Sequence, residues 1–456
     1  MTATAETPTT PTPPIPPTPG RPPTNPAEQR SALARLAMIV LAGVVAAVLT
    51  GVTKTVLVIV AIIVMIMLHE LGHFLTAKWA GMKVTEYYLG FGPRLWSVRR
   101  GETEYGVKAI PAGGYVKIIG MNNLEEVAPE DEARTYRQKP YWRRLSVAVA
   151  GSAVHFIIAF VLLYALNLGY GAVKSELKVR SLTTIQGQAS PAQQAGLENG
   201  DQIVSVDGRK FTSVDNLRTY IQRRPGVPMT FIVQRAGGPV TVTPTPLNLS
   251  SGIQIADPEH PDQFAPLQTA DSCGFIGVEF DHTTEKPGPI GSVARSASDF
   301  GHIASGTVGA LGHLVTFQGV QGYANQLTGD SASPKSTCHT IATGVPSGSD
   351  NRFLSPIGLV RVANDAAKTG MADVLGLLVL INIFVGIFNM VPLLPLDGGH
   401  VLIATYEKIR SMAQGGKRYY ADITKMMPIV YGVFLILVFL GVSSLYLDIV
   451  KPIQLH

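Results

Sequence analysis

Five apolar stretches stand out along the chain, separated by segments rich in polar residues. They cover residues 33–51, 55–77, about 145–170, about 374–394 and about 427–446. An α-helix needs roughly 20 residues to cross a hydrocarbon core of about 30 Å, so each stretch is long enough for one transmembrane span. Three residues, 52–54, separate the first two stretches, which leaves one long bent helix as the alternative to two spans. Because their combined length is about twice what one span requires, we predict two spans.

The composition indicates a membrane protein rather than a soluble one. Of the 456 residues, 46% are hydrophobic and 15% are charged. A soluble domain carries about 25% charged residues, so an ordinary cytosolic enzyme is excluded, as are a collagen-like fibre and a disulfide scaffold. The net charge of +5 comes without a basic patch interleaved with aromatic residues, so we expect no nucleic-acid partner.

Lysine and arginine residues indicate the orientation of the spans, because short loops rich in them face the cytoplasm. Residues 78–144 carry twelve of them, and the connection 408–425 carries five. Both segments are therefore expected to be cytoplasmic, and the segment from 171 to about 372 external. We predict a polytopic α-helical protein of the bacterial cell membrane, with four core transmembrane helices, an extra N-terminal one, a small membrane-associated β-sheet and an external α+β domain.

The spans define the predicted organisation. Residues 1–31 are rich in Pro and Thr and cannot bury enough surface to fold, so they are expected to form a disordered cytoplasmic tail; partner binding by its Pro-rich stretch is an alternative. The other predicted parts are N-terminal spans at 33–77, a cytoplasmic loop with membrane-associated β-hairpins at 78–144, a transmembrane helix at 145–170, the external domain at 177–247, an external region at 248–372, a transmembrane segment at 373–410 and a last transmembrane helix at 426–447.

Three ionisable residues lie inside the second apolar stretch, where HELGHF follows VLVIVAIIVMIML. A charged residue at the centre of a span costs about 2.5 to 3.5 kcal/mol, so His69, Glu70 and His73 require compensation, which a bound metal supplies. Residues i and i+4 share a helical face, so both imidazoles reach one Zn²⁺, while Glu70, rotated by about 100°, reaches a water molecule on it. Chance matches to HExxH occur on the surface of soluble helices, but inside an apolar span we predict a metal site.

A third ligand is expected from the fourth apolar stretch, because catalytic zinc usually has three protein ligands and a water molecule. The segment GIFNMVPLLPLDGGH places Asp397 after two prolines and before two glycines. A broken helix at membrane depth is tolerated where it lines a watery cavity, so we assign Asp397 as the ligand. A Pro-Gly turn with a solvated carboxylate and ligation by His400 are the alternatives. Both metal-binding segments end spans that run from outside to inside, which places the site near the cytoplasmic edge of the membrane.

The motifs of these spans are similar to those of a known family. HELGH in an early span, FGPRLWS and AIPAGGYVKIIGM after it, and NMVPLLPLDGGH in a late span resemble the site-2 protease family of intramembrane zinc metalloproteases (peptidase family M50). The resemblance covers most of residues 55–447 and points to the bacterial regulator-of-sigma-E proteases, which carry a PDZ domain between their central spans. It implies that His69, His73 and Asp397 bind Zn²⁺, and that Glu70 takes a proton from the attacking water and passes it to the leaving amine.

The resemblance also implies roles for three other features. Asn389, in the pattern NxxPxxxLDG, is implied in substrate binding, with helix packing as the alternative. Residues 83–120 alternate as strands, with turns at Gly101 and Gly113–Gly114. The family adds its unwound substrate to such a sheet as an extra strand; an ordinary cytosolic hairpin is the alternative. The third span reads AGSAVHF where the family usually has AGPxxNF, so His155 either packs as a neutral histidine or supports the site.

The external region contains a segment similar to a PDZ domain, residues 177–247. A short helix is expected from Pro191, turns at Asn199–Gly200 and Asp207–Gly208, and a second helix over residues 214–221. In the family this domain excludes substrates with bulky external parts or binds a C-terminus exposed by an earlier cut, and both roles stay open.

Residues 248–372 carry three less specific features. Cys273 and Cys338 are in an oxidising compartment, but their spacing does not decide whether they form a disulfide. His302 and His313 fall on an amphipathic helix expected at the outer membrane surface. We interpret them as surface histidines rather than as a second metal site. Residues 325–351 are expected to form a mobile insertion.

These observations favour a zinc endopeptidase that cuts single-span membrane proteins within the bilayer. The family implies anti-sigma factors or remnant signal peptides as its substrates. A non-catalytic membrane protein, either a metal permease or a PDZ scaffold, is the alternative. A permease needs polar groups across the whole membrane depth, whereas here they cluster near one face.

Overall fold

The computed structural model describes residues 26–50, 53–121, 125–185, 188–249, 253–256, 264–267, 273–328, 355, 358–359, 361–362, 366, 370–421 and 423–450. Residues 1–25 of the predicted tail and most of the predicted insertion at 325–351 lie outside these ranges. The chain divides into two compact units, residues 1–53 with 63–147 and residues 54–62 with 148–456, and each unit is described by itself.

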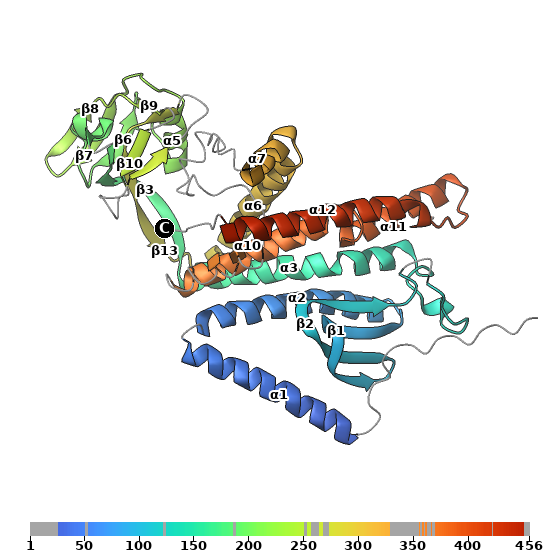
Figure 1. Cartoon of the computed structure of the whole chain (residues 1–456). Helices are drawn as coiled ribbons and strands as arrows, with labels where there is room; N and C mark the ends of the chain where they lie inside the picture. The colour runs from blue at the N-terminus through green and yellow to red at the C-terminus, as the bar shows by residue number, and fades with distance from the viewer. Residues whose placement is uncertain are drawn as a thin grey trace, which may run out of the picture. The chain divides into compact units, whose positions relative to one another are not determined.

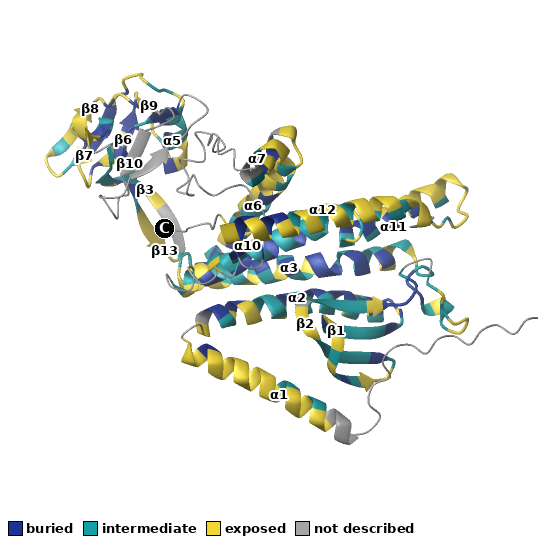
Figure 2. Cartoon of the chain, viewed as in Figure 1, coloured by how far each residue is buried: buried dark blue, intermediate teal, exposed yellow. Residues whose placement is uncertain are grey.

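Five helices among the described residues are long and apolar enough to cross a membrane. They are α1 (Pro26–Leu49), α2 (Thr53–Trp79), α3 (Tyr141–Gly169), α10 (Met371–Asn389) and α12 (Ile423–Val450). Figure 1 shows α1 and α2 as separate helices, so the first two apolar stretches do not form one bent helix. α1 is exposed along most of its length (Figure 2), as expected of an apolar helix whose side chains face lipid.

Two helices begin earlier than the sequence predicted. α1 starts at Pro26, inside the segment expected to be a disordered tail. Proline suits the first turn of a helix because its missing N–H is not needed there, and the Glu, Gln and Arg that follow are good helix formers. α3 starts at Tyr141, before the apolar stretch, because Arg143 and Arg144 continue the helix without being apolar. Apolarity therefore predicted the apolar part of each helix and missed the polar first turns.

In the first unit, a curled hairpin packs against the C-terminal half of α2 (Figure 1). Its strands β1 (Val84–Arg100) and β2 (Thr103–Ile118) are antiparallel and strongly bent. Residues 86–89 of β1 pair with 104–107 of β2 on one side, and residues 84–89 pair with 114–118 on the other, so 114–118 forms an edge of the sheet. Gly101 makes the predicted turn with a φ of 62°, whereas Gly113 and Gly114 continue β2, so the turn expected there is absent.

A compact apolar cluster joins α2, this sheet and the start of α3. It contains Ala77, Ala80, Met82, Val84, Ile118, Tyr136 and Val147, all buried. A short 3₁₀ helix, η1 (Glu132–Arg134), lies in the connection to α3. The cluster holds the sheet against the helical turn that follows His73.

In the second unit, an antiparallel five-stranded sheet has the order β13-β3-β6-β7-β8. The strands are β3 (Ala172–Leu182), β6 (Gln202–Val206), β7 (Phe231–Arg235), β8 (Gly238–Val242) and β13 (Val278–Glu285). Two helices complete this α+β part, α4 (Pro191–Gln194) and α5 (Val214–Gln222), each at its predicted place and capped by a serine hydroxyl. β3 and β13 extend the sheet beyond the predicted limits of 177–247, because the edge strand β13 comes from the following region.

Short strands surround this sheet: β4 (Thr184–Ile185), β5 (Gln188–Ala189), β9 (Leu247–Leu249), β10 (Ile253–Ala256), β11 (Phe264–Leu267) and β12 (Cys273–Phe275). The turn at Asp207 and Gly208 has positive φ at both residues, as predicted from that pair. Cys273 is disulfide-bonded, and Cys338 lies outside the described residues.

The region after the sheet forms α6 (Gly288–Leu314) and α7 (Phe317–Thr328). α6 carries the two exposed histidines, His302 and His313, as predicted. Its apolar residues Phe300, Ile303 and Ala304 pack against Ala159 and Leu163 of α3 and Val379 and Ile383 of α10. The helix therefore buries its apolar face against two candidate spans, where the sequence predicted a helix lying on the membrane surface.

Candidate metal centre

The turn of α2 at residues 69–73 carries the HELGH motif. His69 and His73 are both buried, with exposed fractions of 8% and 7%, whereas Glu70 is partly exposed. Their spacing of four residues places the two imidazoles on one helical face. Within this motif, therefore, the two histidines are buried and Glu70 alone of the three ionisable residues is partly accessible.

The tautomer of His73 follows from its hydrogen bond. Its Nδ1 lies 2.7 Å from the carbonyl oxygen of Val147 in α3, and a carbonyl only accepts, so Nδ1 carries the proton and donates. The lone pair of His73 is therefore on Nε2, which lies 3.2 Å from Nε2 of His69. Donor atoms held tetrahedrally at about 2.0 Å from one ion lie about 3.3 Å apart. The two imidazoles are spaced as ligands of a shared Zn²⁺.

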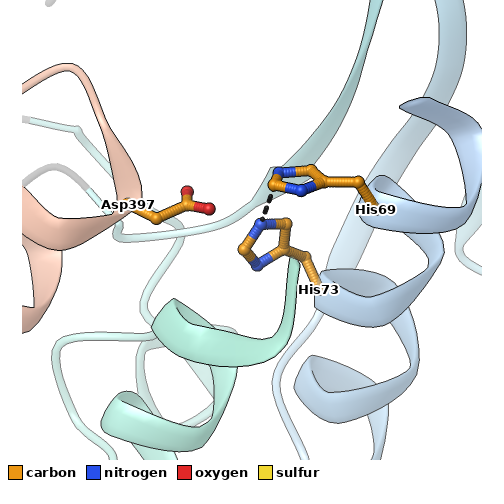
Figure 3. Close-up of side chains that lie close together, drawn as sticks. All are labelled: His69, His73 and Asp397. Atoms are coloured by element: carbon orange, nitrogen blue, oxygen red, sulfur yellow. Dashed lines mark hydrogen bonds between the residues drawn. The ribbon is translucent and has the colours of Figure 1, made fainter. Parts of the chain in front are cut away.

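Asp397 supplies the third donor of this group. One ligand atom each from His69, His73 and Asp397 lies within 4.8 Å of the others, and Figure 3 shows the carboxylate directed towards the imidazoles. His400, the alternative ligand, is not a member of this group. Two imidazole nitrogens and one carboxylate oxygen are a donor set that suits Zn²⁺ and leaves a fourth position open.

The two glycines after Asp397 permit the tight turn that presents it. The predicted segment 373–410 consists of α10 and α11 (Asp397–Ala413), because Pro392 and Pro395 lack the N–H groups of a continuous helix. A Cβ on Gly398 would lie 2.3 Å from the carbonyl oxygens of Met390 and Val391, and one on Gly399 would lie 2.6 Å from a backbone nitrogen of the turn. Only glycine fits this tight turn between α10 and α11, so the LDGG pattern is needed to place the Asp397 carboxylate at the start of α11.

Glu70 lies against the edge of the β-sheet. A Cβ on Gly114 would lie 3.1 Å from Cγ of Glu70 and 3.3 Å from Sδ of Met67, so the sheet edge at 114–118 passes directly beside the acid. The Tyr87 hydroxyl donates to the carbonyl oxygen of Met67 at 2.8 Å. Burial, and then the charge of Glu70, raise the pKa of Tyr87 to about 12, so this hydroxyl keeps its proton at neutral pH.

Two predicted residues lie elsewhere in the helices. Asn389 is the last residue of α10, partly exposed, and its side chain forms no hydrogen bond within the described part of the chain. His155 is 2% exposed, and its Nδ1 lies 2.8 Å from Oδ1 of Asn382. The amide Nδ2 of Asn382 donates to the carbonyl oxygen of Leu378. His155 thus joins α3 to α10, which favours the packing role over support of the site.

Sequence reasoning missed two partners of the motif, Val147 and Tyr87. The carbonyl of Val147 leaves no signal in the sequence, because any residue type has one. Tyr87 belongs to the pair EYY in the predicted first strand. The signal that could have identified Tyr87 is a tyrosine in this strand, had the strand been predicted to turn that position towards α2.

Comparison with known proteins agrees with the resemblance seen in the sequence motifs. The model of peptidase family M50 matches residues 57–437. Zinc metalloprotease Rip1 of Mycobacterium tuberculosis (strain H37Rv) is 30% identical over 414 residues, covering 86% of this chain and 95% of the relative. Zinc metalloprotease Rip1 of Mycolicibacterium smegmatis is 28% identical over 415 residues, again covering 86% and 95%. The match confirms the resemblance drawn from the two metal motifs and the enzyme class with it: the chain belongs to peptidase family M50.

Proposed function

We propose that the protein is an intramembrane zinc endopeptidase that cleaves single-span membrane proteins, with His69, His73 and Asp397 as the zinc ligands and Glu70 as the general base. The observation that carries this proposal is the approach of the three ligand atoms to within 4.8 Å of one another. His69 and His73 lie on α2, a candidate span, and Asp397 begins α11, shortly after the candidate span α10 ends. The zinc metalloprotease names of the relatives support the same chemistry.

In the proposed mechanism Glu70 moves one proton. A Zn²⁺ held by His69, His73 and Asp397 would supply Lewis-acid activation of the attacking water. Glu70, next to the histidines on the same helical turn, accepts the proton of the attacking water and then gives it to the leaving amine. Nδ1 of His73 keeps its proton because it donates to the carbonyl oxygen of Val147. Nε2 therefore remains available as a metal ligand.

The edge of the sheet offers a means of presenting the substrate. A peptide bond inside a helix is shielded by its own hydrogen bonds, so a transmembrane substrate must unwind before it is cut. An extended segment that adds to residues 114–118 would have its backbone groups satisfied and would run past Glu70. We assign Asn389 as a second contact, because its side-chain amide is available to bond an extended backbone.

The external α+β part is proposed to be a PDZ domain. Its five-stranded sheet and the helices α4 and α5 support the assignment. Under the positive-inside rule it lies outside the cytoplasmic membrane, with the active site near the cytoplasmic face. There it either excludes substrates with bulky external domains or binds a C-terminus produced by an earlier protease. Anti-sigma factors and remnant signal peptides are the proposed substrate classes.

The proposal is tested by replacing the base while keeping the ligands. Glu70→Gln is expected to retain one Zn per chain and to abolish cleavage of a co-expressed single-span substrate. Glu130→Gln, at an exposed acid outside the site, is the matched control and is expected to cleave normally. Persistent cleavage by Glu70→Gln would contradict the mechanism, and rapid zinc flux into vesicles containing the protein would favour a permease.

A further inference from the structure

Two tryptophans with exposed indoles lie at the same level of α2 and α3. Trp79 is the last residue of α2 and Trp142 the second residue of α3, with exposed fractions of 88% and 73%. The bond between His73 and Val147 fixes the register of these helices. From that level Trp79 is six residues along α2 and Trp142 five residues back along α3. At 1.5 Å per residue these are about 9 and about 8 Å, so both indoles mark one depth.

Arg143 confirms this register on the same side of the metal centre. Its Nη1 donates to the carbonyl oxygen of Ala80 at 3.4 Å, which joins the residue after Trp79 to the residue after Trp142. Leu75 lies one helical turn before Trp79 and is also exposed, so apolar surface leads directly up to the indole. A large aromatic side chain at the end of an apolar helical face is typical of the boundary between hydrocarbon and headgroups.

A cluster of positive charge accompanies the two indoles. Lys139 Nζ donates to the carbonyl oxygen of Ala133 at 3.1 Å. Its Nζ would lie 3.6 Å from a Cβ on Gly81, and Arg143 bonds the carbonyl oxygen of the neighbouring Ala80, so the two cations lie beside adjacent residues. Consistent with this, burial, and then the positive charges of Arg143 and Arg134, lower the pKa of Lys139. Arg134 pairs with Glu102 at 2.7 Å. Neither Lys139 nor Arg143 forms an ion pair with any carboxylate in the described ranges of the chain.

We propose that Lys139 and Arg143, flanked by Trp79 and Trp142, bind the phosphate of an anionic phospholipid headgroup in the cytoplasmic leaflet. Two cations that lie close together, without an ion-pair partner among the described residues, attract a phosphate diester, and the indoles and Leu75 provide the apolar surface that its acyl chains need. A free phosphate ion would use the cations alone and would leave the indoles without a function. The site lies about 8 to 9 Å from the level of His73, so the bound lipid would fix how deep the metal centre is held.

This inference rests on the proposed insertion of α2 and α3 in the membrane, but it does not depend on catalysis. The test uses the full chain in phosphatidylcholine vesicles that contain either phosphatidylglycerol or phosphatidylcholine with brominated acyl chains. Bromine quenches tryptophan emission at contact, so the mole fraction needed for half quenching reports the preference for each lipid. We expect brominated phosphatidylglycerol to quench at the lower mole fraction, and Trp79→Phe with Trp142→Phe to remove the part of the signal that distinguishes the two lipids.

The charge variants decide whether this is a site. A cation near a membrane surface contributes about 1 kcal/mol, or about fivefold, so Lys139→Gln is expected to lower the preference about fivefold, and Lys139→Gln with Arg143→Gln to abolish it. Arg99→Gln with Arg100→Gln removes two exposed cations at the β-hairpin turn and is expected to preserve it. The proposal would be overturned if both lipids quenched the unmodified protein equally, or if the Arg99 and Arg100 variant lost the lipid preference to the same extent as the Lys139 and Arg143 variant. Loss of the preference when inorganic phosphate is added would also overturn it. Glu70→Gln is expected to keep the lipid preference, which separates this inference from the proposed activity.

Discussion

The Nδ1 of His73 donates a hydrogen bond of 2.7 Å to the carbonyl oxygen of Val147, and this bond determines which ring nitrogen faces His69. A neutral imidazole has one donor nitrogen and one acceptor nitrogen, so fixing the proton on Nδ1 leaves the lone pair on Nε2. The partner is a backbone atom of α3, which no side-chain substitution removes. The ligand geometry of α2 therefore depends on a second helix, and not on the HELGH motif alone.

Loss of His73 is expected to empty the metal site. His73→Ala removes one of the three proposed protein ligands, so the affinity for Zn²⁺ should fall by more than about 100-fold, because even residues that only support ligands contribute about 10- to 100-fold. The measurement is the zinc content of the purified protein after dialysis. His302→Ala, at an exposed histidine of α6, is the control and should retain one Zn per chain. Equal zinc content in the two variants would contradict the assignment.

A side chain at Gly114 is expected to slow catalysis while leaving zinc bound. Its Cβ would lie 3.1 Å from Cγ of Glu70 and 3.3 Å from Sδ of Met67, so Gly114→Val must displace the acid or the sheet edge. Overpacking of this kind costs about 1 to 3 kcal/mol; where that cost is met by displacing Glu70 from its working position, the cleavage rate falls by about 5- to 150-fold. Gly432→Ala, in α12 with no atom within 4 Å of the new Cβ, should cleave at the unmodified rate. A normal rate with Gly114→Val would show that the sheet edge and Glu70 do not depend on each other.

The sequence predicted which three residues come together, but not the structures that hold them. HELGH and LDGG are recognisable because ionisable residues in or beside an apolar span are energetically costly and therefore mark functional sites. The periodicity of a helix then places His69 and His73 on one face. The contact of Gly114 with Glu70 could not be predicted, because it depends on the bends that let residues 86–89 pair on both sides. Helix ends at Pro26 and Tyr141 were missed for a simpler reason: polar first turns carry no apolar signal.

A side chain at Gly398 is expected to disrupt the turn that presents Asp397. The new Cβ would lie 2.3 Å from two backbone carbonyl oxygens, which cannot move independently of the turn. Gly398→Ala should therefore lower both the zinc content and the thermal midpoint of the full chain. Gly441→Ala, in α12 with nothing within 4 Å of its Cβ, should change neither. If Gly398→Ala bound zinc normally, the glycine would have no part in placing the ligand.

The bond between His155 and Asn382 is expected to couple α3 and α10. Both side chains are buried, and the bond measures 2.8 Å. Hydrogen bonds between helices in membranes contribute about 0.6 kcal/mol on average, with a maximum of about 2 kcal/mol. A double-mutant cycle with His155→Leu and Asn382→Leu, measured by unfolding in detergent, should give a coupling energy in this range while zinc binding stays intact. Additive effects of the two substitutions, or a loss of zinc with His155→Leu, would contradict the packing role.

The ion pair of Asp201 and Arg235 is expected to make the stability of the external α+β part depend on pH. Asp201 is 1% exposed and accepts two bonds from the guanidinium, at 2.6 and 2.9 Å. Burial alone would raise the pKa of this carboxyl, but Arg235 and the backbone N–H of Glu198 lower it below the ordinary value of about 3.9. Since the folded pKa is the lower one, the stabilisation is complete above about pH 5 and is lost as pH falls below about 3.9 towards the folded pKa.

Asp201→Asn should lower the free energy of unfolding by about 2 kcal/mol at neutral pH and remove this acid dependence, as followed by proteolysis of the α5 to β7 segment in urea. Asp215→Asn, at a highly exposed carboxylate, is the control and should leave the pH dependence unchanged; an unaltered profile in Asp201→Asn would show that another carboxyl is responsible.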